Sequence, residues 1–390
     1  MDASRKWMKF LWKSLTYVLV AVLASAISLS LWGERYSKLL ELEKVIDEMF
    51  VGEYDRADIE DAAAAAMVYA LSDRWSYYLT QEEYASHQES VSNSYVGIGV
   101  TVALREDGTG FDILTVEPGG SAAEGGIRPG DIMIEVDGQS LAQKDNAEMR
   151  AMTQGEVGTT VKIGVLRDGE KMEFTLERRR IQVKVAEGQL LDGNVGLVRI
   201  DNFNSGCSKM TIDVIKSLVD QGATSLIFDV RNNPGGYVNE MVRVLDYLLP
   251  EGVVFREMDY AGNTDERYSD ADCIEMPMAV LVNGNSYSAA EFFAACLQEY
   301  EWAVVVGEQT SGKGYYQYTI ELSDGSAVNL SCGKYFTPGG VNLTEAGGIK
   351  LDVTLKVDQE TAALIYGKLL EPQDDPQLQA AIEALQKTGR

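Results

Sequence analysis

The sequence predicts a multidomain α/β protein that is attached to a membrane through its N-terminus. Three observations lead to this prediction. A run of uncharged residues occupies positions 14–32, and short β-type segments separated by glycines fill positions 95–178. From residue 179 onward, continuous apolar segments alternate with helical ones. Apolar strands that alternate with helices are typical of a buried, mostly parallel sheet.

The composition excludes several classes of protein. The chain has 390 residues, enough for two or three domains, and 34 basic against 60 acidic residues give a net charge of −26. No basic stripe occurs beyond the N-terminus, whereas nucleic-acid binding requires clustered Lys and Arg, so we expect no nucleic-acid partner. One histidine and four widely spaced cysteines argue against a zinc site, and we expect neither a metal nor a cofactor.

The N-terminus predicts a membrane anchor over 1–33. Basic residues precede the uncharged run 14–32, namely Arg5, Lys6, Lys9 and Lys13. A run of this length can cross a bilayer, and the basic flank places the N-terminus in the cytoplasm. The alternative is a cleaved signal peptide with "ASA" at 24–26 as the cleavage site. In both cases the rest of the chain lies outside the cytoplasmic membrane.

Residues 34–94 are predicted to be helical, with "DIEDAAAAAMVYAL" as the clearest helix, although "LSDRWSYYLTQEEY" interrupts the pattern. Residues 95–178 read as a compact β-rich module, in which "PGGSAAEGGIRPGD" forms a short helix between turns. We therefore expect two regions of different character ahead of the α/β core.

The α/β core is predicted over 179–370. Its strands include "GLVRIDNF", "SLIFDV", "MAVLV" and "AVVVG", with helices between them near 207–220, 237–248 and 289–300. Later segments look like added antiparallel strands. The segment 371–390 is predicted to form a final helix, with Asp375 as its N-cap and Pro376 at its first position.

Ser288 lies in "NGNSYSAAEFF", directly after the apolar strand "MAVLV". The plainer interpretation is structural, because Ser288 and Glu291 have the spacing of a helix capping box. The functional interpretation uses the same geometry, since a hydroxyl at a helix N-terminus lies where a developing anion is stabilised. A nucleophilic serine also needs a base, and the one histidine, His87, lies in a separate polar segment.

Lys313, in "GEQTSGKGYYQ", is the candidate base. The segment approaches a nucleotide-binding P-loop, but Gly314 replaces the required Ser or Thr and a strand-like segment follows, so we reject that function. Burial between glycines would lower the pKa of Lys313 and leave a neutral amine. Ser288 and Lys313 follow consecutive strands, so their loops should emerge at one edge of the sheet. The alternative is an ordinary surface lysine in a turn.

The segment "FDVRNNPGGYV" ends a strand and opens the next helix with two glycines. It is either a simple strand-to-helix turn or an oxyanion hole, in which Gly235 and Gly236 present backbone N–H groups beside that of Ala289.

These motifs together resemble the carboxyl-terminal processing (tail-specific) serine proteases, peptidase family S41 with a PDZ domain, of the membrane-anchored bacterial type. "SAAE" at 288–291 resembles the nucleophile motif of that family and "GKGYYQ" at 312–317 its lysine motif. The resemblance implies that Ser288 is the nucleophile, Lys313 the general base and Gln317 the residue that orients the lysine. It also implies a core like those of the crotonase and ClpP folds.

"GIGV" at 97–100 and "GGIRPGDIMIEVDG" resemble PDZ motifs, which implies a PDZ domain over 95–178. In such domains a loop binds a free carboxylate through backbone N–H groups, here those of Ile98, Gly99 and Val100. "YFTPGGVNLTEAGGIKLDV" resembles the segment after the catalytic lysine, although Leu351 stands where proline is usual.

The resemblance implies an extracytoplasmic Ser–Lys endopeptidase that cleaves proteins near free, apolar C-termini, with the PDZ domain recognising the tail and gating activity. Its partners would be protein or peptide substrates and the membrane, with a homodimer or a regulatory protein left open. A catalytically silent PDZ scaffold is the main alternative, and a hydratase- or thioesterase-like enzyme is another.

Overall fold

The structure is a computed structural model and describes residues 7, 12–13, 15–17, 19–20 and 36–388. By its internal contacts the chain divides into two units, Met1–Ala64 and Ala65–Arg390. In the first unit, residues 36–49 are helical. The helix α2 (Arg56–Tyr69) begins in the first unit and ends in the second. Among the described residues no helix is long and apolar enough to cross a membrane, and the span predicted over 14–32 lies for the most part outside them.

The second unit is built around a six-stranded sheet in the order β10-β11-β12-β15-β16-β19. Its pairs are parallel except for β10 with β11. The strands are β10 (Ala186–Leu191), β11 (Val195–Ile200), β12 (Ser225–Asp229), β15 (Met278–Val282), β16 (Ala303–Gly307) and β19 (Val353–Thr354). The predicted mostly parallel sheet is confirmed.

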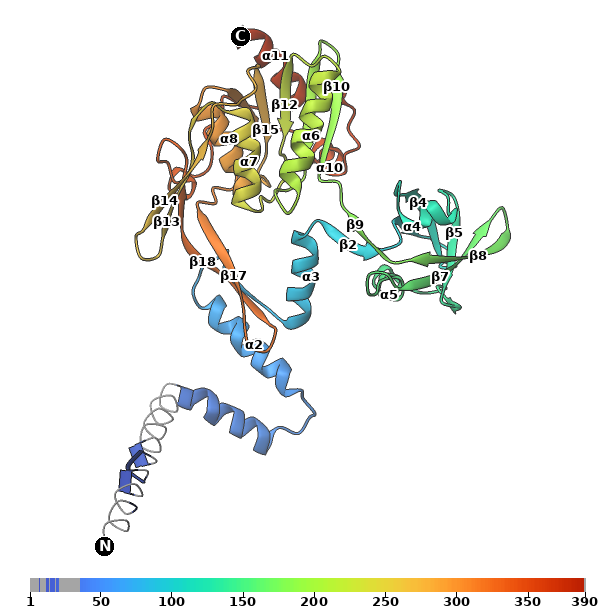
Figure 1. The fold of residues 1–390 in the computed structure, drawn as a ribbon, viewed down its shortest axis with the longest axis vertical. Helices are drawn as coiled ribbons and strands as arrows, with labels where there is room; N and C mark the ends of the chain where they lie inside the picture. The colour runs from blue at the N-terminus through green and yellow to red at the C-terminus, as the bar shows by residue number, and fades with distance from the viewer. Residues whose placement is uncertain (1–6, 8–11, 14, 18, 21–35, 389–390) are drawn as a thin grey trace. The chain divides into compact units, whose positions relative to one another are not determined.

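Helices cover both faces of this sheet (Figure 1). On one face lie α6 (Cys207–Asp220), α7 (Val238–Leu248) and α8 (Ala289–Glu299). On the other lies α11 (Pro376–Thr388), which begins as predicted, with Asp375 accepting the N–H groups of residues 377 and 378. In β12, Leu226 and Phe228 pack toward α6–α8 while Ile227 packs toward α11. Burial on both faces explains why the central strands have continuous apolar segments.

A second, antiparallel sheet packs against the outer side of α8. It has the order β1-β18-β13-β14, with β17 also paired to β18. Its strands are β1 (Tyr77–Leu79), β13 (Gly252–Asp259), β14 (Thr264–Ser269), β17 (Tyr315–Glu321) and β18 (Ala327–Phe336). Residues 289–297 of α8 are all buried between the two sheets, so the helix after Ser288 is held firmly. The segment "LSDRWSYYLT" enters this sheet as β1, which explains why it interrupts the helical pattern.

The β-rich module has its own core and its own sheet, in the order β3-β4-β5-β7-β8. The strands are β3 (Val100–Leu104), β4 (Phe111–Val116), β5 (Ile132–Val136), β7 (Thr160–Arg167) and β8 (Glu170–Glu177), with β6 (Gln139–Ser140) beside β5. The helices are α4 (Ser121–Gly125), at the predicted place, and α5 (Asn146–Thr153). The chain enters and leaves through the pair β2 (Ser94–Gly97) and β9 (Arg179–Gln182), preceded by α3 (Gln81–Val91).

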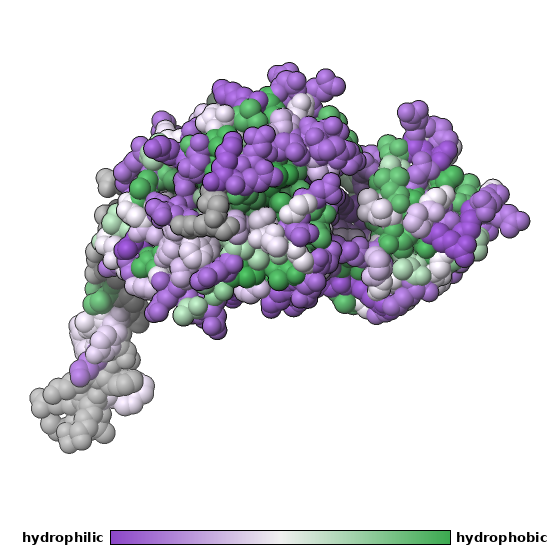
Figure 2. Space-filling view, turned by 90° about the horizontal axis from the view of Figure 1, so that it is seen from above, coloured by the Kyte–Doolittle hydropathy of each residue, from purple (hydrophilic) through white to green (hydrophobic). Residues whose placement is uncertain are grey.

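The remaining short elements are α9 (Leu343–Ala346), α10 (Gln359–Tyr366) and the 3-10 turn η1 (Pro372–Asp374). Polar and charged side chains cover much of the face in Figure 2, in keeping with the net charge of −26. The four cysteines are free, and Cys296 lies in the core.

Candidate active site

Ser288 stands at the sharp turn between β15 and α8. Its backbone has φ 58° and ψ −127°, a conformation that L-residues rarely adopt and that costs about 1–3 kcal/mol. The preceding loop is fixed, because the Ser286 hydroxyl donates to the Val230 carbonyl (2.7 Å) and the Tyr287 N–H donates to the Asn233 carbonyl (3.2 Å). The strained turn holds a half-buried hydroxyl at the N-terminus of a buried helix.

The Glu291 side chain ties this turn to the lysine loop. Its carboxylate accepts the N–H groups of Ser288 (3.1 Å), Gly312 (2.7 Å) and Lys313 (2.9 Å). The capping interaction expected between Ser288 and Glu291 is therefore present from the glutamate side, and the same carboxylate also fixes the candidate base. Glu291 therefore caps the helix and also positions the backbone of Lys313, so the structural and the functional interpretations of Ser288 are compatible.

Lys313 lies under an aromatic cover. Its Nζ is 4.5 Å from the centroid of the Trp75 ring and 5.9 Å from that of Tyr287. Burial lowers the pKa of Lys313 to about 8, although the charges of Asp73 and Glu291 act in the opposite direction. A neutral amine is therefore accessible near neutral pH, as a general base requires.

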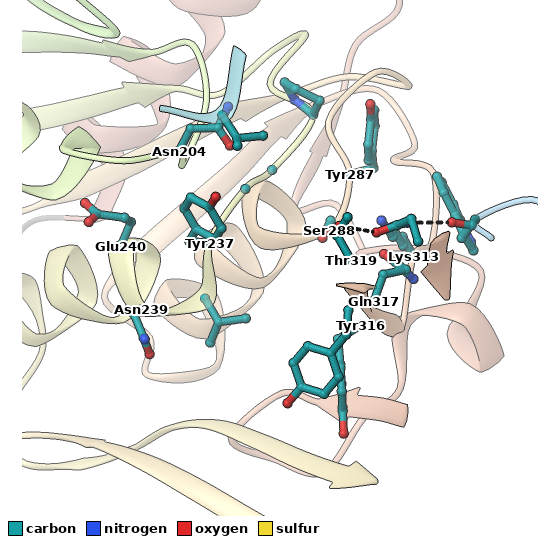
Figure 3. Close-up of a pocket in the computed structure, with 18 of the residues that line it drawn as sticks. Asn204, Tyr237, Asn239, Glu240, Tyr287, Ser288, Lys313, Tyr316, Gln317 and Thr319 are labelled. Atoms are coloured by element: carbon teal, nitrogen blue, oxygen red, sulfur yellow. Dashed lines mark hydrogen bonds between the residues drawn. The ribbon is translucent and has the colours of Figure 1, made fainter. Parts of the chain in front are cut away.

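Ser288 and Lys313 line the same cleft, but among the described residues no hydrogen bond joins their side chains. The Ser288 Oγ instead accepts a hydrogen bond from the Tyr335 hydroxyl at 3.0 Å. Figure 3 shows Ser288 and Lys313 in one part of the cleft, with Gln317 nearby.

The predicted glycine turn approaches Ser288 directly. A Cβ at Gly235 would lie 2.8 Å from the Ser288 Cβ and 2.9 Å from the Ala289 nitrogen, so the turn requires glycine there. Gly236 is held by a bridge to Phe203. The Gly235 N–H, however, donates to the Asn233 side chain at 2.8 Å. This engagement corrects the expectation for Gly235, and Gly236 and Ala289 remain as the candidate oxyanion donors.

Among the described residues, no hydrogen bond joins Gln317 to Lys313, in contrast to the expected orienting role. Gln317 lies on β17 opposite Ser331 of β18, and its Nε2 donates to the Ser331 hydroxyl (3.1 Å) and the Tyr315 carbonyl (3.0 Å). The Ser331 side chain in turn forms a hydrogen bond with Asp73. Burial acts to raise the pKa of Asp73, but its hydrogen bonds and the charge of Lys313 hold that pKa below its usual range. The strand pairing thus connects Gln317 to a carboxylate near the lysine rather than to the lysine itself.

The cleft has a volume of about 1100 Å³, and its lining is rich in aromatic residues. These are Trp75, Tyr77, Tyr84, Tyr237, Tyr287, Tyr316, Tyr318 and Tyr335. Sequence reasoning missed Asp73, Trp75 and Tyr335, although two quoted motifs, "DRWSYYL" and "YFTPGG", contain them. His87 also lines the cleft, on α3, where burial lowers its pKa.

The predicted carboxylate loop lies between β2 and β3. Gly99 has φ +82°, the carbonyls of Ile98 and Gly99 accept the N–H groups of Ala122 (2.9 Å) and Glu117 (2.8 Å), and β3 is an edge strand. Ile98, Gly99 and Val100 line a groove of about 830 Å³. Five residues on and just after α5 line it too, namely Asn146, Met149, Arg150, Thr153 and Gln154. A loop beside a free strand edge and a helix has the form needed to seat an extended peptide.

Comparison with known proteins agrees with this architecture. Residues 194–355 match the model of peptidase family S41, and residues 96–177 match that of the PDZ domain. The "Carboxy-terminal processing protease CtpA" of Bacillus subtilis (strain 168) is 32% identical over 342 residues, which cover 83% of this chain and 72% of that protein. The "Probable CtpA-like serine protease" of Staphylococcus aureus (strain COL) is 31% identical over 82% of this chain, which spans 64% of that relative's length.

Among solved structures, a "Photosystem II D1 C-terminal processing protease" aligns with a TM-score of 0.47 and 27% identity, covering 81% of this chain and 86% of that one. The identity and coverage of the Bacillus relative, together with both family models, establish that the chain belongs to peptidase family S41 and carries a PDZ domain ahead of its peptidase region.

Proposed function

We propose that this protein is a serine endopeptidase in which Ser288 is the nucleophile and Lys313 the general base. The observation that carries the proposal is the pairing, in one cleft, of a hydroxyl on a strained turn with a half-buried lysine whose pKa is lowered to about 8. Glu291 binds the backbone of both loops, so the two side chains keep a fixed relation.

In the proposed reaction, the Ser288 Oγ attacks the scissile carbonyl and its proton passes to the Lys313 Nζ. The carbonyl oxygen gains negative charge, which the N–H groups of Gly236 and Ala289 stabilise. Lys313 then protonates the departing amine as the C–N bond breaks. Water attacks the resulting ester, Lys313 takes its proton, and the Oγ recovers a proton as the C–O bond breaks.

The PDZ groove supplies the proposed selectivity for C-termini. An extended substrate tail would pair with the open edge of β3, and its carboxylate would bind the N–H groups of the loop Ile98–Val100. Val100, Val102 and Met149 line the groove, which favours apolar tails. The name of the Bacillus relative describes carboxy-terminal processing, and this chain is 32% identical to that protein over 342 residues.

We further propose that residues 14–32 anchor the protein in the cell membrane with the peptidase on the extracytoplasmic side. The support is the uncharged run and the basic residues ahead of it. Protease added to intact spheroplasts should digest the peptidase region and spare an N-terminal tag, whereas a protected peptidase region would reverse the topology. Crosslinking in the same cells would reveal a homodimer or a regulatory partner.

The proposed activity is tested with the full chain in detergent and unfolded protein substrates that differ only in their last residues. Wild type should cleave tails with apolar ends, with products identified by mass, and a fluorophosphonate probe should label Ser288. Binding of C-terminal peptides without cleavage or labelling would instead make the protein a PDZ scaffold. Hydrolysis of thioesters but not peptides would point to the thioesterase-like alternative.

A further inference from the structure

The Tyr335 side chain is buried beside the nucleophile. It comes from β18, and its ring packs against Phe292 of α8 with the ring centroids 4.3 Å apart and against Phe255 of β13 at 5.6 Å. Its hydroxyl donates to the Ser288 Oγ at 3.0 Å. The phenol is therefore held in place by two neighbouring rings, and its one polar side-chain atom is hydrogen-bonded to the serine.

The backbone of Tyr335 is bound to the lysine loop. Its N–H donates to the carbonyl of Gly314, the residue after Lys313, at 3.1 Å. The Asn342 side chain donates to the carbonyls of both Gly314 (2.8 Å) and Tyr335 (3.0 Å). One residue thus contacts the nucleophile through its side chain and the loop of the base through its backbone.

We infer that Tyr335 is a third catalytic residue, which stabilises negative charge on the Ser288 Oγ through its hydroxyl hydrogen bond. The inference rests on the proposed function. Charge develops on Oγ twice, when its proton moves to Lys313 during attack and when the ester C–O bond breaks in deacylation. A donor already aimed at that oxygen strengthens as the charge grows, which lowers the barrier of both steps.

The bond is compatible with proton transfer to Lys313. A serine oxygen has two lone pairs and one hydrogen, so accepting from Tyr335 leaves its own hydrogen free to donate. Burial raises the pKa of Tyr335 well above that of a free phenol, so it keeps its proton throughout the cycle. The proton balance of the reaction is unchanged, because the transferred proton moves between Oγ, Lys313, the leaving amine and water.

The same contact also has an opposite interpretation, in which Tyr335 restrains Ser288 in an unproductive orientation. The two are distinguished by Tyr335→Phe, which removes one oxygen and keeps the ring packed against Phe255 and Phe292. A catalytic donor predicts that kcat falls about 10- to 100-fold with KM nearly unchanged, and that fluorophosphonate labelling of Ser288 slows. A restraint predicts a higher kcat and faster labelling.

The pH profile provides a readout that a merely structural role would not give. The charged groups that act on Lys313 are Asp73, Glu291 and Arg74, and the Tyr287 and Trp75 rings cover it. Tyr335 is not among them, so the acid limb of kcat/KM should stay in place in Tyr335→Phe while the whole profile drops.

Tyr300→Phe is the matched control. Tyr300→Phe also removes one phenol hydrogen bond, which the Tyr300 hydroxyl donates to the Val253 carbonyl at 3.0 Å. Tyr300 does not line the cleft. Both variants should lose similar thermal stability, while only Tyr335→Phe loses rate. If Tyr335→Phe fails to fold, Tyr335→fluorotyrosine serves instead, because its more acidic phenol is a stronger donor and should keep or raise kcat.

The outcomes distinguish the two proposals. An unchanged or raised kcat in Tyr335→Phe, with an active wild type, overturns the role of Tyr335 alone, as does a fluorotyrosine variant with severely reduced kcat. A wild-type chain that neither cleaves peptides nor is labelled at Ser288 overturns the proposed function, and the role of Tyr335 with it.

Discussion

The PDZ groove and the peptidase cleft are both proposed to bind a substrate oxygen through backbone N–H groups, yet they are built differently. In the groove, a glycine at φ +82° shapes a loop beside an open strand edge. In the cleft, Gly236 lies among side chains of controlled reactivity, and burial shifts the pKa values of Lys313 and of Glu291 behind it. Binding in the groove should therefore depend on backbone shape, and reactivity in the cleft on single side-chain atoms.

The largest expected effect comes from removing the proposed nucleophile or base. Ser288→Ala and Lys313→Ala should each lower kcat/KM by about 10³-fold or more, and the double variant should be no worse, because the two groups act as one unit. Binding of C-terminal peptides to the groove, measured by calorimetry, should not change. A Lys313→Ala variant with a tenth of wild-type turnover would contradict the Ser–Lys mechanism.

A smaller loss is expected from Glu291→Gln. The amide offers one acceptor oxygen and an NH₂ donor where the carboxylate accepts three N–H groups from the nucleophile turn and the lysine loop. We expect kcat to fall about 10- to 100-fold, and unfolding to become easier by about 1–3 kcal/mol, measured by urea denaturation.

Glu299→Gln on the same helix is the control for Glu291→Gln. Glu299 accepts from the Thr337 hydroxyl and the Gly339 N–H, both outside the cleft. It should cost stability without lowering kcat. Equal loss of kcat in both variants would show that α8 acts only as a scaffold.

On the groove side, Gly99→Val should weaken binding of apolar C-terminal peptides about tenfold. Valine is strained at φ +82°, and its Cβ would lie 3.3 Å from the Glu117 Cβ, so the loop must change shape. Cleavage of long substrates with free C-termini should show a higher KM, while cleavage of short peptides that do not reach the groove stays the same. Equal effects on both substrates would mean that the groove does not select tails.

The fold could be predicted closely because its signals are local. The strand "MAVLV" is apolar at every position and "SLIFDV" is apolar at its centre, since both faces are covered, and the Asp375–Pro376 cap marks the last helix directly. Ser288 and Lys313 could be placed in one site because they follow neighbouring parallel strands.

The contacts between distant segments could not be predicted. Trp75 covers Lys313 only because β1 joins the second sheet, and Tyr335 reaches Ser288 only because β18 runs past α8. Gln317 illustrates the limit most clearly. The resemblance implied that it orients Lys313, but its position opposite Ser331 in the strand pair directs its amide nitrogen to the Ser331 hydroxyl.

The smallest expected effect is a shift in the pH dependence of kcat/KM, which depends on Lys313 in the cleft and not on the groove. Lys313 must be neutral to accept a proton, so kcat/KM should rise with pH through its pKa of about 8. The Asp73 carboxylate stabilises the ammonium form and raises that pKa, whereas the Arg74 guanidinium lowers it. Asp73→Asn should therefore move the acid limb to lower pH, and Arg74→Gln should move it to higher pH.

General damage to the segment would lower the rate but would not shift the two pH profiles in opposite directions. Opposite shifts from adjacent positions would therefore indicate two opposing charges that act on Lys313. Arg74 also stacks on Trp75, with its guanidinium carbon 4.1 Å from the ring centroid, so Arg74→Gln loosens the cover over Lys313. Water reaching the amine would favour the ammonium form and raise the pKa further, in the same direction as the lost charge. The profiles of kcat/KM against pH for the two variants should bracket that of wild type, and shifts of the same sign would remove Asp73 and Arg74 as opposing influences on the base.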